Sequence, residues 1–419
     1  MSRAPSAPVG PRAAWHVLSS RDFGPYFWGN AISSSGSWFH NLAASILVYR
    51  LTGSELLLGV LNFSQFAAIL LLSPWAGAAA DRFDRRRLLI AAEVAATLLS
   101  TTLAGVAFAG HANEWVVIGF TLGLGIASAV AAPAQAALVS GLVRPEELPT
   151  AVALNSMTFN LARAIGPALA ALAVVTVGIP AAFAINSASY LALVFALLVV
   201  SPRPQPRSAS PKLRESLRLV RADRSLLAYL LVVAAVGYAS DPVNTLAPAF
   251  AEAFGRQDTA AGFIVGAFGA GAVTAALVVA GRTAGSRGRM AVTLILLGGG
   301  VVGFSLSPWL PLGFVFLFVA GFGYLASNTS ATTRLQLGVE ESQRGRIMAL
   351  WSIAFLGVRP LASLLDGLVA DLVSVRAAGV VLAVPALAGA AFLVTSRARG
   401  ASSRQHRASE HARASGRSR

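Results

Sequence analysis

The chain has 419 residues, of which 55% are hydrophobic and only 12% are charged. Soluble domains carry about 25% charged residues, so this composition excludes a soluble enzyme and a disordered chain. The formal net charge of +15 comes from basic residues that lie between long apolar runs, which argues against a nucleic-acid-binding face. The sequence contains no cysteine, so it has neither disulfides nor a thiolate metal site.

Twelve apolar segments are long enough to cross about 30 Å of hydrocarbon as helices. In chain order they are 24–49, 57–80, 88–109, 115–140, 150–176, 181–200, 225–250, 259–281, 291–308, 311–334, 347–370 and 377–396. Most contain Gly, Ser, Asn or Pro, which is typical of helices that pack together around a cavity. The sequence therefore predicts an all-α membrane protein with twelve transmembrane helices.

The longest connection divides these helices into two pseudo-symmetric six-helix bundles. The predicted parts are a cytoplasmic tail (1–22), a first bundle (23–200), a linker (201–224), a second bundle (225–396) and a basic tail (397–419). In the linker, Leu213, Leu217 and Val220 share a face between basic residues, which predicts an amphipathic helix on anionic lipid. The basic tail lacks core-forming residues and is predicted to be disordered.

The basic residues also predict an orientation. If both termini are cytoplasmic, 28 Lys and Arg lie on that side and three, Arg50, Arg256 and Arg376, lie on the other. Lysine occurs once, at Lys212, and the heavy use of arginine and alanine is typical of high-GC bacterial coding. We therefore expect a multi-pass protein of a bacterial inner (plasma) membrane with both termini in the cytoplasm.

Four charged residues fall deep inside predicted helices, namely Arg163, Asp241, Arg359 and Asp366. A charge in the bilayer interior costs several kcal/mol on insertion scales, so each needs a partner or water. A carboxyl group that moves toward and away from an arginine would release and take up a proton. These four residues are therefore the candidates for proton coupling. Glu93, near the end of its run, is expected to reach the cytoplasmic membrane interface.

Polar side chains recur at helical spacing on several of the runs and predict a central aqueous cavity. The candidate cavity residues are Asn30, Ser33, Ser37, Asn41, Gln135, Asn160, Tyr238, Thr245, Tyr324 and Asn328. Neighbouring aromatic residues favour an amphipathic small-molecule substrate. The charge of that substrate stays open, because arginines and acids occur together.

The stretch Gly77-Ala-Ala-Ala-Asp81-Arg82-Phe-Asp84-Arg85-Arg86-Arg87 resembles the signature loop of the major facilitator superfamily. One position departs, since Asp84 stands where the superfamily pattern has glycine. The resemblance implies a latch between the cytoplasmic ends of the two halves, formed here by Gly77, Asp81, Arg82, Arg85, Arg86, Arg344 and Arg346.

Further stretches, such as Ser34 to Trp38, Pro133 to Leu138 and Ala164 to Pro167, are similar to enterobactin-exporter-like and macrolide-efflux-like drug exporters. This resemblance implies the major facilitator fold and export of small drug- or siderophore-like molecules by alternating access. A monomer is the default working unit of the superfamily. The fourth predicted helix lacks the embedded arginine of many drug/proton antiporters, so the resemblance does not carry antiport over. Protons are expected as the coupling partner because of the embedded acids and arginines.

Two alternative functions remain open. A metabolite importer or facilitator would have the same fold, because fold does not set direction. A membrane receptor or scaffold would bind a ligand without moving it. The sequence contains no phosphate-binding loop, metal-ligand spacing or nucleophile–base pairing, so we expect no enzyme activity, no cofactor and no metal.

Overall fold

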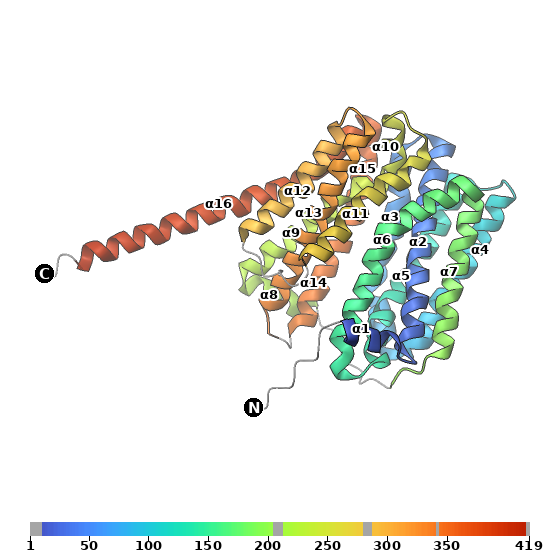
Figure 1. Cartoon of the computed structure of the whole chain (residues 1–419), viewed down its shortest axis with the longest axis horizontal. Coiled ribbons are helices and arrows are strands. Elements are labelled where there is room, and N and C mark those ends of the chain that lie inside the picture. Colours follow the sequence, from blue (N-terminus) through green and yellow to red (C-terminus); the bar gives the residue numbers. More distant parts are fainter. Residues whose placement is uncertain (1–10, 204–212, 280–286, 341–342, 416–419) are drawn as a thin grey trace.

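The computed structural model describes residues 11–203, 213–279, 287–340 and 343–415. Within these ranges every regular element is a helix (Figure 1). The helices are α1 Pro11–Leu18, α2 Phe23–Thr52, α3 Glu55–Arg82, α4 Arg85–Phe108, α5 Glu114–Leu142, η1 Pro145–Glu147, α6 Leu148–Val177, α7 Ile179–Val199, α8 Leu213–Ala222, α9 Arg224–Thr245, α10 Ala247–Ala253, η2 Asp258–Ala260, α11 Ala261–Val279, α12 Arg287–Leu306, α13 Leu310–Leu337, α14 Arg344–Leu356, α15 Arg359–Leu372 and α16 Val375–Ser415.

Among the described residues, ten helical segments are long and apolar enough to cross a membrane. The helix α2 is 30 residues long but is not among the ten. Its polar residues, including Asn30 and Asn41, lower its hydropathy. Those polar residues occur where the sequence predicted a cavity lining.

The helices form two groups, seen side by side in Figure 1. Helices α2 to α7 pack mainly on one another, and so do α9 to α16. The two groups meet mainly through α3 against α15 and α6 against α11. We name the two ends of the molecule after α8 and α10, which lie at the bottom and top of Figure 1.

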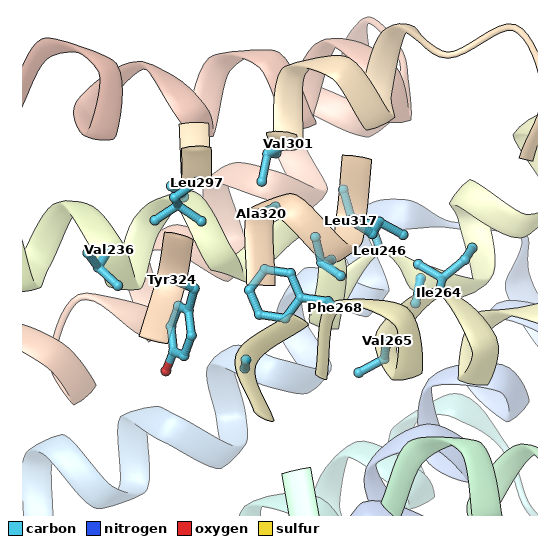
Figure 2. Close-up of a cluster of buried hydrophobic side chains, with 14 of the residues drawn as sticks. Val236, Leu246, Ile264, Val265, Phe268, Leu297, Val301, Leu317, Ala320 and Tyr324 are labelled. Atoms are coloured by element: carbon cyan, nitrogen blue, oxygen red, sulfur yellow. The ribbon is translucent and has the colours of Figure 1, made fainter. Parts of the chain in front are cut away.

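The second group is held together by the buried apolar cluster shown in Figure 2. Phe268 of α11 and Tyr324 of α13 contact each other there, with ring centroids 5.4 Å apart. Gly321 lets these two helices approach closely, because a Cβ at this position would collide with the Phe268 carbonyl oxygen. This packing fixes the helices that carry one wall of the candidate site.

Two predicted helices are interrupted in the structure. The run 225–250 was predicted as one helix but forms two, α9 and α10. The run 347–370 likewise forms α14 and α15 instead of one helix. Pro248 and Pro360 have no N–H, so the carbonyls of Asn244 and Leu356 lose their helical donors. The second break puts Arg359 at the first position of α15.

The linker and the tail differ in part from expectation. The helix α8 occurs where an amphipathic helix was predicted, but its Val220 is buried in the core cluster rather than turned to lipid. Residues 204–212 of the linker lie outside the described residues. The helix α16 continues through Ser415, where disorder was predicted, and projects away from the two groups (Figure 1). Alanine and arginine, which recur in this segment, are strong helix formers.

Candidate substrate cavity

A cavity of about 340 Å³ lies between the two helical groups, and we call it the main cavity. This volume lies within the range of small-molecule pockets, roughly 300–1,000 Å³. Helices α2, α3, α4, α5 and α7 form one wall, and Phe355, Leu356 and Arg359 form the other. The structure brings five of the predicted cavity residues together in its lining, namely Asn30, Ser33, Ser37, Asn41 and Gln135.

An amide network crosses the first wall. Gln135 Nε2 donates to Asn30 Oδ1 at 2.6 Å, and Asn30 Nδ2 donates to Asn155 Oδ1 at 3.0 Å. The hydroxyl of Tyr26 donates to the same Asn155 oxygen at 3.4 Å. These bonds join α2, α5 and α6 and fix the directions of the amide groups.

Glu93 also lines the main cavity, which corrects its predicted place at the membrane interface. Its side chain is 8% exposed, and the Ser33 hydroxyl donates to Glu93 Oε2 at 3.3 Å. The reason is the packing of α4 against α5 and α7, which turns this face of α4 inward. Neither of the ion pairs found among the described residues includes Glu93.

Arg359 of the second group lines the main cavity on the wall opposite Glu93. Its guanidinium lies 5.0 Å from the ring centre of Phe66 on α3 and 5.4 Å from that of Phe355 on α14. Both distances suit cation–π attraction. Arg359 Nε is buried and has no acceptor in the described part of the chain. The arginine is thus held by aromatic rings of both groups and stays available to another acceptor.

A side cavity of about 40 Å³ adjoins the main cavity and shares four lining residues with it, Trp38, Asn41, Phe66 and Arg359. Asp241 lines the side cavity as well. The volume is large enough for water molecules. The side cavity is therefore lined by both the Asp241 carboxyl group and Arg359, which also lines the main cavity.

Asp241 and Asp366 are 2% and 0% exposed and belong to α9 and α15, which pack against each other. The Thr245 hydroxyl donates to Asp241 Oδ2 at 2.9 Å, whereas neither oxygen of Asp366 has a donor among the described groups. Both predicted proton-coupling acids are therefore buried in the second group.

The α10 end is closed by contacts between the groups. Arg50, at the end of α2, donates twice to the Asp258 carboxylate of η2, once at 2.9 Å from Nη2. The hydrogen bond to Asp258 raises the pKa of Arg50. Nearby, a Cβ added to Gly367 of α15 would lie 2.8 Å from the Glu55 carbonyl oxygen and 3.1 Å from Gly59 Cα. The contact between α3 and α15 thus depends on glycine at both positions.

Among the side chains that the structure describes, the remaining predicted cavity residues do not appear in the lining of the main cavity. Tyr238 is half-buried on α9, and Tyr324 packs between Phe268 and Phe355. Asn328 Oδ1 is buried without a donor among the described groups. The side chains of Asn160 and Arg163 lie outside those described.

The predicted latch residues lie at the α8 end. Arg86 donates to the carbonyls of Leu197 and Leu198 at 2.6 and 2.7 Å, so it caps the end of α7 within its own group. The side chain of Asp81 lies outside those described. The other predicted latch residues are partly or fully exposed, namely Gly77, Arg82, Arg85, Arg344 and Arg346.

Solved structures share this arrangement. A bacterial homologue of the human lysosomal transporter Spinster, in an inward-facing and occupied conformation, matches with a TM-score of 0.71 and 14% identity over 93% of this chain and 97% of its own. A D-xylose–proton symporter matches with a TM-score of 0.68 and 14% identity, over 89% of this chain and 97% of its own. The chain therefore shares the helical fold of these two proteins.

Sequence relatives define the family more closely. A family described as transmembrane secretion effector matches residues 12–416, and the chain belongs to this family of the major facilitator superfamily. It is 25% identical to the staphyloferrin A transporter of Staphylococcus aureus, over 83% of this chain and 89% of that protein. It is 29% identical to an enterobactin exporter of Shigella boydii (72% and 74%) and 23% identical to macrolide efflux protein A of Streptococcus pyogenes (83% and 89%). These matches confirm the resemblance to exporters.

Sequence reasoning missed several lining residues. Glu93 was assigned to the interface, although an acid within an apolar run signals a possible cavity position. Gln65 and Tyr190 were not singled out as lining residues, yet both contribute to the main cavity. Their positions follow from helix rotation, which the spacing of residues on one helix cannot fix.

Proposed function

We propose that this chain is a secondary transporter, with twelve membrane-crossing helices in two six-helix bundles, that exports small amphipathic molecules by alternating access. The main cavity carries this proposal, because both groups line it and their direct contacts close it toward the α10 end. The arginine-rich connections lie at the α8 end, which we assign to the cytoplasm of a bacterial inner membrane. The cavity would then receive substrate from the cytoplasm.

We also propose that export is driven by proton antiport through Asp241 and Asp366. The support is the burial of both acids and the place of Asp241 in the side cavity that Arg359 also lines, because a buried carboxylate must carry a proton or meet a counter-charge. Arg163 belongs to the proposal through its position in the sequence. Asp81, Arg344 and Arg346 would latch the two groups together at the α8 end in one transport state, as the signature-loop resemblance implies.

Efflux from proteoliposomes tests this function. Vesicles loaded with an amphipathic dye, containing the purified monomeric chain in anionic lipid, receive an imposed pH gradient. We expect gradient-dependent dye flux that a protonophore abolishes and that Asp241→Asn and Asp366→Asn each reduce by at least about tenfold, or 1.4 kcal/mol. Asp371→Asn, on the exposed face of the same α15 as Asp366, is the matched control and should retain flux.

Three outcomes contradict parts of this proposal. Flux that ignores both the protonophore and the Asn variants leaves a facilitator. Dye accumulation coupled to proton entry in the same direction makes the chain an importer. Binding without flux across a panel of compounds would support the receptor or scaffold alternative.

A further inference from the structure

The wall around Glu93 is rich in oxygen atoms. The Ser33 hydroxyl bonds to the carboxylate, and Asn30 and Gln135 line the same cavity. The hydroxyl of Tyr190, another lining residue, lies 3.5 Å from Ser37 Oγ. Carboxylate, amide and hydroxyl oxygens together, beside an aromatic ring, suit the recognition of an organic cation.

Among the described residues, the wall that carries Glu93 holds no cation to balance its charge. Its neighbours on α2, α5 and α7 include the uncharged Ser33, Gln135 and Tyr190, and the one cation in the described lining of the main cavity, Arg359, lies on the opposite wall. A lone carboxylate at membrane depth is costly, so Glu93 must carry a proton or meet a cation.

Arg359 does not fill this role. It lines the opposite wall of the main cavity and lies over the rings of Phe66 and Phe355. It also borders the side cavity that Asp241 lines. Asp241 therefore offers Arg359 a counter-charge on its own side of the main cavity, and Glu93 is left for the ligand.

We propose that Glu93 binds the cationic group of the substrate, which is an amphipathic organic cation such as a lipophilic amine. The apolar body of this ligand would lie against Trp38, Phe66 and Phe355. This inference rests on the proposed function, since it assigns the substrate class of the same cavity. A proton and the cation exclude each other at Glu93, and such competition is what an antiporter requires of its binding site.

Two ions of matched size test the charge preference. Tetraphenylphosphonium and tetraphenylborate have the same shape and opposite charge, and their binding to purified protein can be followed by quenching of tryptophan fluorescence. We expect the phosphonium to bind at least about tenfold more tightly, and Glu93→Gln to abolish that preference. Glu146→Gln, an exposed acid in η1, is the matched control and should leave both affinities unchanged.

A pH titration of the wild type provides a second measurement, which holds even where Glu93→Gln fails to fold. Phosphonium affinity should fall as pH decreases and a proton occupies Glu93, while borate affinity should not fall with it. The inference is overturned if the wild type prefers borate, and the loss of this borate preference in Arg359→Gln would assign the site to Arg359 instead. It is also overturned if Glu93→Gln binds the phosphonium as tightly as the wild type does, or if neither ion binds. Phosphonium binding at Glu93 without flux in vesicles would instead contradict the transport function and leave the cation site intact.

Discussion

Asp84 shows how one residue can replace a motif glycine without strain. Its φ of −63° and ψ of 118° lie in the extended region, and its side chain accepts from Arg87 N–H at 2.8 Å. Asp84 is therefore the N-cap of α4. Among the described residues, positive φ angles occur at glycines such as Gly53 and Gly110, both at helix ends. The departure from the superfamily pattern is thus a helix cap.

Replacing this cap should destabilise the start of α4. Asp84→Ala removes the acceptor for the Arg87 N–H and should cost about 1 kcal/mol, whereas Asp84→Asn keeps a capping oxygen and should cost little. Hydrogen exchange measures the effect directly, and faster exchange is expected in the first turn of α4 for Ala alone. Equal exchange in all three proteins would contradict the capping role.

For single residues, the sequence predicted which polar side chains share a helix face better than it predicted where each side chain lies in the folded protein. The serine and asparagine positions on α2 share one helical face, so spacing alone grouped Asn30, Ser33, Ser37 and Asn41. The burial of Asp241 and Asp366 depends on the packing of α9 and α15, which are far apart in the chain, and no local pattern encodes such packing. Glu93 was misplaced because depth along a helix does not reveal which way the side chain turns.

At the scale of elements, glycines set how closely the two groups meet. Gly59 and Gly367 let α3 and α15 touch at the α10 end, where a Cβ on either would meet backbone atoms of the other helix. Backbone atoms cannot move aside as a flexible side chain can, so added volume should separate the helices.

We therefore expect Gly59→Val to open the α10 end. Overpacking costs typically about 1–3 kcal/mol, which shifts a two-state population by about 5- to 150-fold. A cysteine at Asn62, which lines the side cavity, should then react faster with a maleimide from the α10 side. Gly119→Val is the control, since a Cβ there meets nothing within 4 Å; an equal rise in both variants would contradict the seal.

Element boundaries were predicted less well than element existence. Apolar length identified the long helices, but the breaks after Thr245 and Leu356 were missed. Proline is tolerated inside α5 and α9, at Pro133 and Pro242, and interrupts the helix near Pro248 and Pro360. Whether a proline bends or ends a helix depends on the neighbours that satisfy the freed carbonyl, and the sequence does not display these neighbours.

At the scale of the whole molecule, the two ends differ in charge. Arginines flank the exposed connection between α3 and α4 at the α8 end, and the α4–α5 connection at the α10 end carries none. By the positive-inside rule, this asymmetry supports the proposed cytoplasmic position of the α8 end. The absence of cysteine from the sequence makes any introduced cysteine a specific label.

This orientation predicts a labelling pattern in spheroplasts. A membrane-impermeant maleimide should modify His111→Cys, in the α4–α5 connection, and should leave Phe83→Cys, in the α3–α4 connection, unmodified until the cells are permeabilised. Both native positions are exposed, so accessibility to solvent is matched. The reverse pattern would place the arginine-rich end outside and would contradict the assigned direction of export.

The interruption between α14 and α15 separates a helix that lines the main cavity through Phe355 and Leu356 from a helix that packs against α3. Pro360 leaves the Leu356 carbonyl without a helical donor, so a bend at the junction breaks no further backbone bond there. In the proposed alternating-access mechanism, α14 would tilt over the cavity while α15 stays packed against α3.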